Sequence, residues 1–212
     1  MLIKLSKQDV HASELMGADT VKLCEMQGFP PRLENEQQSR VEANVFGFKA
    51  EFAVARLFHV EPPVVNVLTD GGIDLWFNDI SIDVKFTNKE RGPLIFDSME
   101  KFKADTAVLV GRTQHDDVMR INGCVSRNVF EWESYKHDFG YGERMVMDVD
   151  QLKPIEWLWR NAMEYKLKKG EGLRITEQLT LLRCWMKDAL TGVTILRFWI
   201  MWQIKTTHLG LI

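Results

Sequence analysis

Residues 73–86 read IDLWFNDISIDVKF, and this stretch decides which fold we expect for the chain. In residues 80–86 apolar side chains alternate with polar ones, which predicts a strand with two different faces. Residues 73–77 predict a second strand. Because only Asn78 and Asp79 separate the two strands, the sequence predicts an antiparallel hairpin with a tight turn.

The register of this hairpin brings charged residues together. Counting outward from the turn pairs Leu75 with Ile82 and, one step further, Asp74 with Asp83. Directly opposite residues on paired strands have Cβ atoms about 5 Å apart. Lys85 follows Asp83 by two positions, so its side chain projects from the same face of the strand. Two facing carboxylates repel each other, and a divalent cation between them would turn this repulsion into attraction.

The segment before the hairpin is predicted to be mostly helical. After a short strand or an unpaired lead, Ser6 and Asp9 can cap a helix over about residues 7–26, which a glycine and two prolines end. Apolar residues at three- and four-residue steps predict a second helix from Glu34 to about Phe58.

Further strands are predicted on both sides of the hairpin. A β-branched run at residues 64–68 precedes it, and a continuous apolar run at residues 106–111 predicts a strand buried on both faces. Residues 119–126 predict an outer strand. Together these patterns predict an α/β fold with a central mixed sheet, flanked by the 34–58 helix and by the 97–104 segment.

The last part of the chain is predicted to be helical. One helix begins after Pro154 and ends at Gly170, and a further helix covers residues 175–190. An apolar, aromatic stretch follows at residues 193–204. Three regions result, an N-terminal helical segment, an α/β core and a helical, basic C-terminal region, at residues 1–33, 34–150 and 151–212.

Charge is divided unevenly along the chain of 212 residues. Residues 1–150 carry 17 Lys and Arg against 25 Asp and Glu, and residues 151–212 carry 10 against 5. An acidic body is not typical of a nucleic-acid binder, unless some of its acids hold a metal. The three widely spaced cysteines predict reduced thiols in a cytoplasmic protein. No charge-free apolar run reaches about 18 residues, so no membrane partner is expected.

The arrangement of these acids and the lysine resembles the PD-(D/E)xK nuclease superfamily, whose members share a restriction-endonuclease-like fold. Glu51 in GFKAEFAVARLF resembles the helical glutamate of the family, and Asp74 in DGGIDLWF resembles its metal-binding aspartate. The tripeptide Asp83-Val84-Lys85 resembles the (D/E)-x-K motif.

This resemblance covers about residues 41–126. The Gly-x-Asp-Leu pattern at the first hairpin strand also resembles phage and restriction-system members of the superfamily. One position departs from the family pattern, because Ile73 stands where a proline would precede the aspartate. The resemblance therefore implies the family's central mixed sheet and its chemistry, without assigning a subfamily.

The implied activity is that of a nuclease that uses Mg²⁺, or Mn²⁺, to hydrolyse phosphodiester bonds in DNA. Magnesium prefers carboxylate, carbonyl and water oxygens, which Asp74, Asp83 and the carbonyl of Val84 would supply. Glu51 would add a ligand directly or through water. Lys85 would orient or help to deprotonate the attacking water and would stabilise the charge developing around phosphorus.

DNA contacts are expected close to this site. Lys89 and Arg91 follow the second hairpin strand and are candidates to hold the DNA backbone. An enzyme that cuts both strands would need two sites, which favours a homodimer. A phage-encoded nuclease would act in the host cytoplasm.

Other interpretations of the same residues stay open. Asp83 and Lys85 would also suit a solvated strand face, and Asp74 could bond local backbone amides after the turn. The chain could instead be a non-catalytic DNA- or protein-binding module on the same scaffold, such as a phage accessory protein. The apolar segment 193–212 could serve docking or dimerisation.

Overall fold

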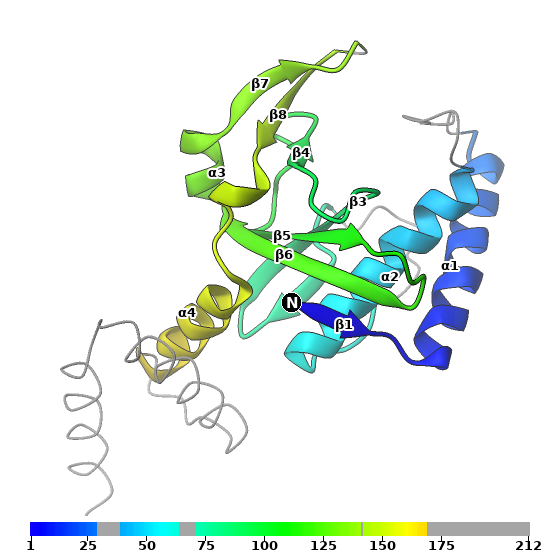
Figure 1. Ribbon diagram of the computed structural model, residues 1–212, viewed down its shortest axis with the longest axis horizontal. Coiled ribbons are helices and arrows are strands. Elements are labelled where there is room, and N and C mark those ends of the chain that lie inside the picture. The colour runs from blue at the N-terminus through cyan, green and yellow to red at the C-terminus, as the bar shows by residue number, and fades with distance from the viewer. Residues whose placement is uncertain (29–38, 64–70, 141, 169–212) are drawn as a thin grey trace, which may run out of the picture. The chain divides into compact units, whose positions relative to one another are not determined.

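The computed structural model describes residues 1–28, 39–63, 71–140 and 142–168. It is a mixed α/β protein in which a mixed sheet is flanked by helices (Figure 1). One compact unit comprises residues 1–157. Of the second unit, which begins at Leu158, the structure describes the helical residues up to Lys168.

The central sheet of the described residues has five strands, β1 (Leu2–Lys4), β2 (Leu75–Phe77), β3 (Ile80–Thr87), β5 (Thr106–Arg112) and β6 (Val118–Ser126). They lie in the order β1-β6-β5-β3-β2. Strands β3 and β5 run parallel and the other neighbours run antiparallel, which confirms the predicted mixed sheet.

The predicted hairpin forms between β2 and β3. Leu75 pairs with Ile82 in the predicted antiparallel register. The ladder ends at this pair, so it does not contain the predicted pairing of Asp74 with Asp83, and the N–H of Asp74 donates to the carbonyl of Ile82 instead. Asn78 and Asp79 have φ angles of 48° and 64°, and positive φ at both positions is what a two-residue hairpin turn of this kind requires. The neighbouring strand β5 is buried along almost its whole length, as its continuous apolar run predicts.

Strand β6 is not the outer strand that the sequence predicts. The short strand β1 pairs with it in antiparallel register, from Leu2 opposite Arg120 to Lys4 opposite Val118, and so forms the edge of the sheet. Three residues give too short a pattern to predict a pairing partner more than a hundred positions away. The first residues of the chain therefore belong to the same sheet as the hairpin.

Two long helices, α1 (Lys7–Met26) and α2 (Arg40–Phe58), lie where helices are predicted. Ser6 and Asp9 form a reciprocal capping box at the start of α1. Ser39 caps α2 by accepting a hydrogen bond from a backbone N–H of its first turn.

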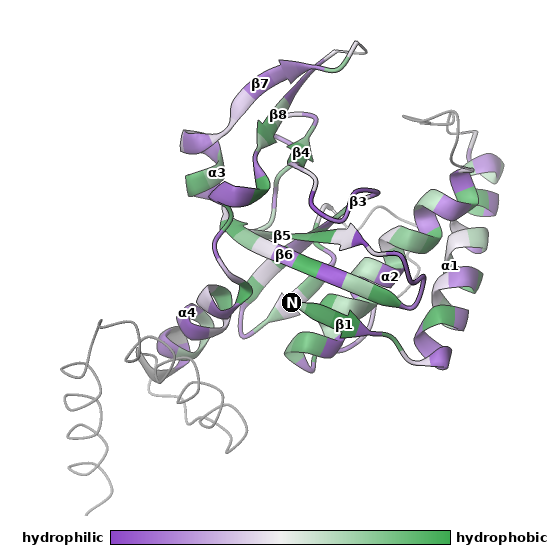
Figure 2. Cartoon of the chain, in the orientation of Figure 1, coloured by the Kyte–Doolittle hydropathy of each residue, from purple (hydrophilic) through white to green (hydrophobic). Residues whose placement is uncertain are grey.

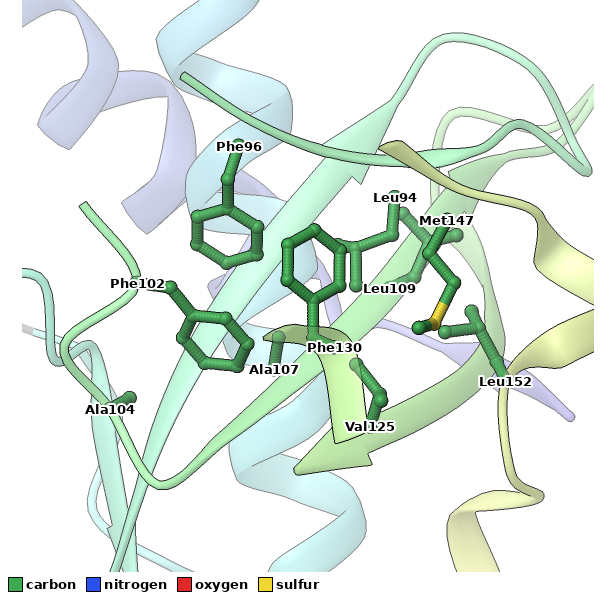
Figure 3. Packing of buried hydrophobic residues seen from close by; sticks show 10 residues of the cluster. All are labelled: Leu94, Phe96, Phe102, Ala104, Ala107, Leu109, Val125, Phe130, Met147 and Leu152. Atoms are coloured by element: carbon green, nitrogen blue, oxygen red, sulfur yellow. The ribbon is translucent and has the colours of Figure 1, made fainter. Parts of the chain in front are cut away.

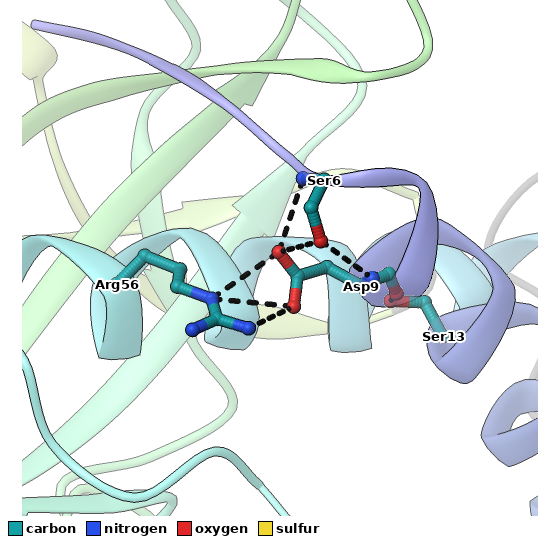
Figure 4. A network of polar contacts seen from close by, with 4 residues as sticks. All are labelled: Ser6, Asp9, Ser13 and Arg56. Carbon is teal, nitrogen blue, oxygen red and sulfur yellow. Dashed lines mark hydrogen bonds and ion pairs between the residues drawn. The ribbon is translucent and has the colours of Figure 1, made fainter.

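A polar network ties α1 to α2 (Figure 4). Arg56 donates to the carboxylate of Asp9, with an Nη2–Oδ1 distance of 2.7 Å and an Nε–Oδ2 distance of 3.2 Å. The carboxylate also accepts from the N–H and the O–H of Ser6. Elsewhere on these helices a Cβ at Gly17 would lie 2.6 Å from a methyl carbon of Val45, so this close approach requires glycine.

The network lowers the pKa of Asp9. Burial alone would raise this pKa, but the hydrogen bonds from Arg56 and Ser6 favour the charged carboxylate and outweigh burial. The folded-state pKa therefore lies below the ordinary aspartate value of about 3.9. Its contribution to stability is present above that pH and is lost as the pH falls through the folded-state pKa.

Helix α2 covers one face of the central sheet. Phe46 stacks on Phe86 of β3 with 5.4 Å between ring centroids, and Phe58 stacks on Phe77 of β2 with 4.4 Å. These contacts bury the apolar side of the hairpin, which leaves the face that carries Asp83 for other elements to cover.

A second, smaller sheet lies in the described residues, formed by β4 (Leu94–Phe96), β7 (Tyr135–Asp138) and β8 (Glu143–Met147) in the order β4-β8-β7. No pattern in the sequence predicts this smaller sheet. Its strands have only three to five residues. Strand β7 is hydrophilic and exposed at every position, so its sequence has no alternation of apolar and polar residues (Figure 2). The short helix α3 (Arg127–Glu133) precedes β7.

A cluster of buried hydrophobic residues joins the smaller sheet and α3 to the central sheet (Figure 3). Three phenylalanines form its aromatic part: Phe96 stacks on Phe102 at 4.4 Å between centroids, and Phe130 meets their rings edge-on at 5.2 and 5.5 Å. The 97–104 segment, which is predicted to flank the sheet, contributes Phe102 and Ala104 to this cluster.

The chain after β8 continues through a short 3₁₀ helix, Val149–Gln151, to helix α4 (Ile155–Lys168). Helix α4 begins directly after Pro154, as predicted. Residues 34–38 of the second predicted helix, the predicted strand 64–68, the predicted helix 175–190 and the apolar stretch 193–204 lie outside the described residues. Among the helices that the structure describes, none is long and apolar enough to cross a bilayer.

Replacing Asp9 with asparagine tests the network between α1 and α2. We expect Asp9→Asn to lower the Tm at neutral pH, because Arg56 loses its anionic partner. The deficit should shrink as the pH falls from about 3.9, where the carboxylate of the unfolded chain becomes protonated, through the lower folded-state pKa of Asp9. Thermal unfolding followed by circular dichroism across the acid range measures this. Asp19→Asn, at an exposed position of α1, is the control, and an equal loss of Tm in both variants would contradict the prediction.

Truncating Phe130 tests the aromatic part of the hydrophobic cluster. Phe130 is fully buried, so Phe130→Ala should lower the free energy of unfolding by about 3–5 kcal/mol. Trp132 lies on the same helix with 87% of its surface exposed, so Trp132→Ala should change the free energy of unfolding by no more than about 0.5 kcal/mol. Chemical denaturation of both variants gives the comparison, and similar losses would show that the cluster does not support the fold in this way.

Candidate functional site

Asp74 is fixed beside β3 by two hydrogen bonds. Its backbone N–H donates to the carbonyl of Ile82 at 2.9 Å, and its Oδ2 accepts from the N–H of Val84 at 2.6 Å. The regular pairing of β2 with β3 ends at Leu75, so a side-chain carboxylate receives a backbone N–H just past the end of the ladder. This places the Asp74 carboxylate next to the peptide that links Asp83 to Val84.

Asp83 and Lys85 form an ion pair within β3. The Lys85 Nζ lies 2.5 Å from Asp83 Oδ1, which places both side chains on one face of the strand. Asp83 is 1% exposed, whereas the side chain of Lys85 is 37% exposed. A buried carboxylate carries a desolvation cost of several kcal/mol unless a charge or hydrogen bonds compensate it, and here the lysine two positions along supplies the opposite charge.

The neighbouring strand β5 shows which face this is. Asp83 is in register with Ala107, and Lys85 with Leu109. Both β5 residues belong to the hydrophobic cluster, so the ion pair lies on the cluster side of the sheet. The Lys85 Nζ also lies 4.9 Å from the centroid of the Phe96 ring.

Glu51 lies on α2 and is half-buried. Within the described ranges, no three His, Cys, Asp or Glu side chains are grouped closely enough to hold a metal ion. The structure thus pairs Asp83 with Lys85 and holds the Asp74 carboxylate against the backbone at Val84. It does not gather Glu51 with the two aspartates into a three-acid cluster.

The residue before Asp74 has a packing role. Ile73 is partly buried and packs against the hydrophobic cluster. An apolar side chain therefore stands at the position where the family pattern has proline, and it anchors the start of β2 beside the site.

Lys89 and Arg91, the candidates for DNA contacts, lie in the exposed loop between β3 and β4. Arg91 pairs with Asp150 at 2.5 Å. The loop is held against β5 at Gly111, where an added Cβ would lie 2.2 Å from the carbonyl oxygen of Glu90. This loop is therefore anchored to the sheet, and Lys89 lies on its exposed side.

A cavity of about 450 Å³ lies beside Arg91, and its lining includes Ile121, Asn122, Asp150 and Leu152. The hairpin residues Asp74, Asp83 and Lys85 do not line it. The candidate site on the hairpin thus does not coincide with this cavity.

Two residues that shape the site cannot be recognised from the sequence. Asp105 accepts from the N–H of Ser81 at 2.9 Å and from its O–H at 2.6 Å, which fixes the start of β3 to the start of β5. Phe96 lies under the lysine of the motif. Neither residue has a spacing signal, because each comes from a different segment of the chain.

No family model, no curated protein and no solved structure matches the chain. The geometry of the hairpin and the residues that pack around it are therefore the basis for assigning a function to the chain.

Two variants of Asp74 test its bond to the backbone of β3. Asp74→Ala leaves the N–H of Val84 without this acceptor, so we expect a loss of about 1–3 kcal/mol in the free energy of unfolding. Asp74→Asn retains an oxygen acceptor and should lose clearly less. Urea unfolding gives the stabilities, and amide hydrogen exchange at Val84 gives the local effect. Equal losses, with unchanged exchange at Val84, would contradict this role of Asp74.

Proposed function

We propose that the protein is a metal-dependent deoxyribonuclease that hydrolyses phosphodiester bonds at the Asp74, Asp83 and Lys85 site, on a restriction-endonuclease-like fold. The observation that carries the proposal is the buried ion pair of Asp83 with Lys85, next to the backbone N–H that holds the Asp74 carboxylate. Asp74 lies beside the Asp83–Val84 peptide, and Lys85 contacts Asp83. These contacts support part of the set that the resemblance to PD-(D/E)xK nucleases implies, which also includes Glu51.

The donor set suits a small, hard cation. Two carboxylates and the carbonyl of Val84 are oxygen ligands, and Mg²⁺ in proteins commonly uses one or two carboxylates and keeps several waters. Two acids are therefore sufficient, and the contribution of Glu51 stays a prediction from the resemblance. When bound, Mg²⁺ or Mn²⁺ supplies positive charge that neutralises a phosphate oxygen and lowers the pKa of water.

The residues of the chain have distinct roles in this proposal. Lys85 has the more exposed side chain of the ion pair, so its ammonium can donate hydrogen bonds to an incoming water and to the phosphate. Asp83 fixes the position of that ammonium. Asp74 keeps its carboxylate beside β3 because the Val84 N–H holds it there. Lys89 and Arg91 in the adjoining loop contribute positive charge for the DNA backbone.

One observation favours a second candidate function, a non-catalytic DNA- or protein-binding module. Asp83 is almost fully buried and already paired with Lys85, as a structural ion pair would be. The two functions differ in their response to metal, because a ligand that binds only the folded state raises the Tm. A rise in Tm with Mg²⁺ or Mn²⁺ that Asp83→Asn abolishes would favour the nuclease.

Cleavage assays on linear, circular and branched DNA with Mg²⁺ test the nuclease directly. We expect Asp83→Asn and Lys85→Gln to reduce cleavage by about 10²-fold or more, because each removes a charged group from the site. Asp79→Asn makes the same charge change at an exposed position of the same hairpin and should cleave like the wild type. Wild-type cleavage by Asp83→Asn would exclude this site as the catalytic centre.

A further inference from the structure

The ammonium group of Lys85 lies between an anion and an aromatic ring. Its Nζ is 2.5 Å from Asp83 Oδ1 and 4.9 Å from the centroid of Phe96. A cation within about 6 Å of a ring centroid is attracted by the negative face of the ring. Two different groups thus contact the same ammonium, and they come from different strands.

The ring of Phe96 is held firmly in place. Phe96 is 2% exposed and stacks on Phe102 with an angle of 7° between the ring planes. Phe130 packs against it edge-on, and Figure 3 shows the three rings together in the hydrophobic cluster. Strand β4 holds the backbone of Phe96 opposite Met145 of β8. The ring therefore cannot turn away from Lys85 without disturbing the cluster.

We propose that Phe96 is a positioning residue that holds the Lys85 ammonium at Asp83 for the reaction. A lysine side chain has four flexible methylene groups and loses considerable rotamer freedom when it is fixed. The ring confines the ammonium from a second direction, so Lys85 is already in place before the substrate arrives. The catalytic consequence rests on the proposed nuclease function, whereas the positioning itself rests on the contacts of Phe96.

The neighbouring Phe102 provides a matched control. Both phenylalanines are buried and belong to the same stacked pair, but the ring of Phe96 is the one that lies under Lys85. If Phe96 acted only by packing, Phe96→Leu and Phe102→Leu would have similar effects. If Phe96 positions the lysine, Phe96→Leu should change the position of the Lys85 ammonium and Phe102→Leu should not. Phe96→Tyr keeps the ring and should therefore keep the ammonium in place.

The first measurement is spectroscopic. Protons that lie over the face of an aromatic ring resonate upfield, so the terminal methylene protons of Lys85 should be shifted upfield in the wild type. We expect this shift to be lost in Phe96→Leu and retained in Phe102→Leu and Phe96→Tyr. Unchanged Lys85 resonances in Phe96→Leu, or an equal change in Phe102→Leu, would overturn the proposal. If Phe96→Leu does not fold, Phe96→Met gives the same test, because it also removes the ring and comes closer to the volume of the phenylalanine side chain.

The second measurement is kinetic. Phe96→Leu should reduce the kcat for DNA cleavage about threefold to tenfold, with KM unchanged, because substrate binding does not depend on the ring. In a Lys85→Gln background the same substitution should have no further effect on cleavage. If the wild type cleaves no DNA, the proposed function fails, while the Lys85 resonances still decide whether Phe96 positions the lysine.

Discussion

Asp83 places a carboxylate in the interior of the protein, and this buried charge requires a compensating group among the residues that pack around β3. The strand is covered by α2 on one face and by the hydrophobic cluster on the other, so little of the carboxylate is exposed to bulk water. Its neighbour in register on β5 is Ala107, which offers no charge. The opposite charge comes from Lys85, two positions along the same strand, whose side chain is the more exposed of the two.

The features that could be predicted from the sequence are local. The turn at Asn78 and Asp79 and the alternation in β3 fix the register of the hairpin within fourteen consecutive residues. The capping box of α1 is a four-residue signal. The proximity of Asp83 to Lys85 follows from the two-residue repeat of a strand, which is why this part of the candidate site needed no tertiary information.

The features that could not be predicted depend on pairing between distant segments. The edge position of β1 and the smaller sheet arise from strands of three to five residues, and β7 is exposed at all four positions. Short exposed strands have no hydrophobic face and therefore no periodic signal. The bond from Val84 to the Asp74 side chain likewise arises because the ladder ends at Leu75, which no count of positions reveals.

The fold by itself does not require the charges of the hairpin. A pair of aliphatic residues at positions 83 and 85 would match Ala107 and Leu109 on β5 and would extend the hydrophobic cluster. Replacing a buried ion pair by well-packed apolar residues is often neutral or stabilising, so stability gives little reason for Asp83 and Lys85. Asp74, by contrast, has a structural task at the end of the ladder as well as a place beside the pair. The physical case for a functional site is therefore strongest at Asp83 and Lys85, where packing alone would favour other residues.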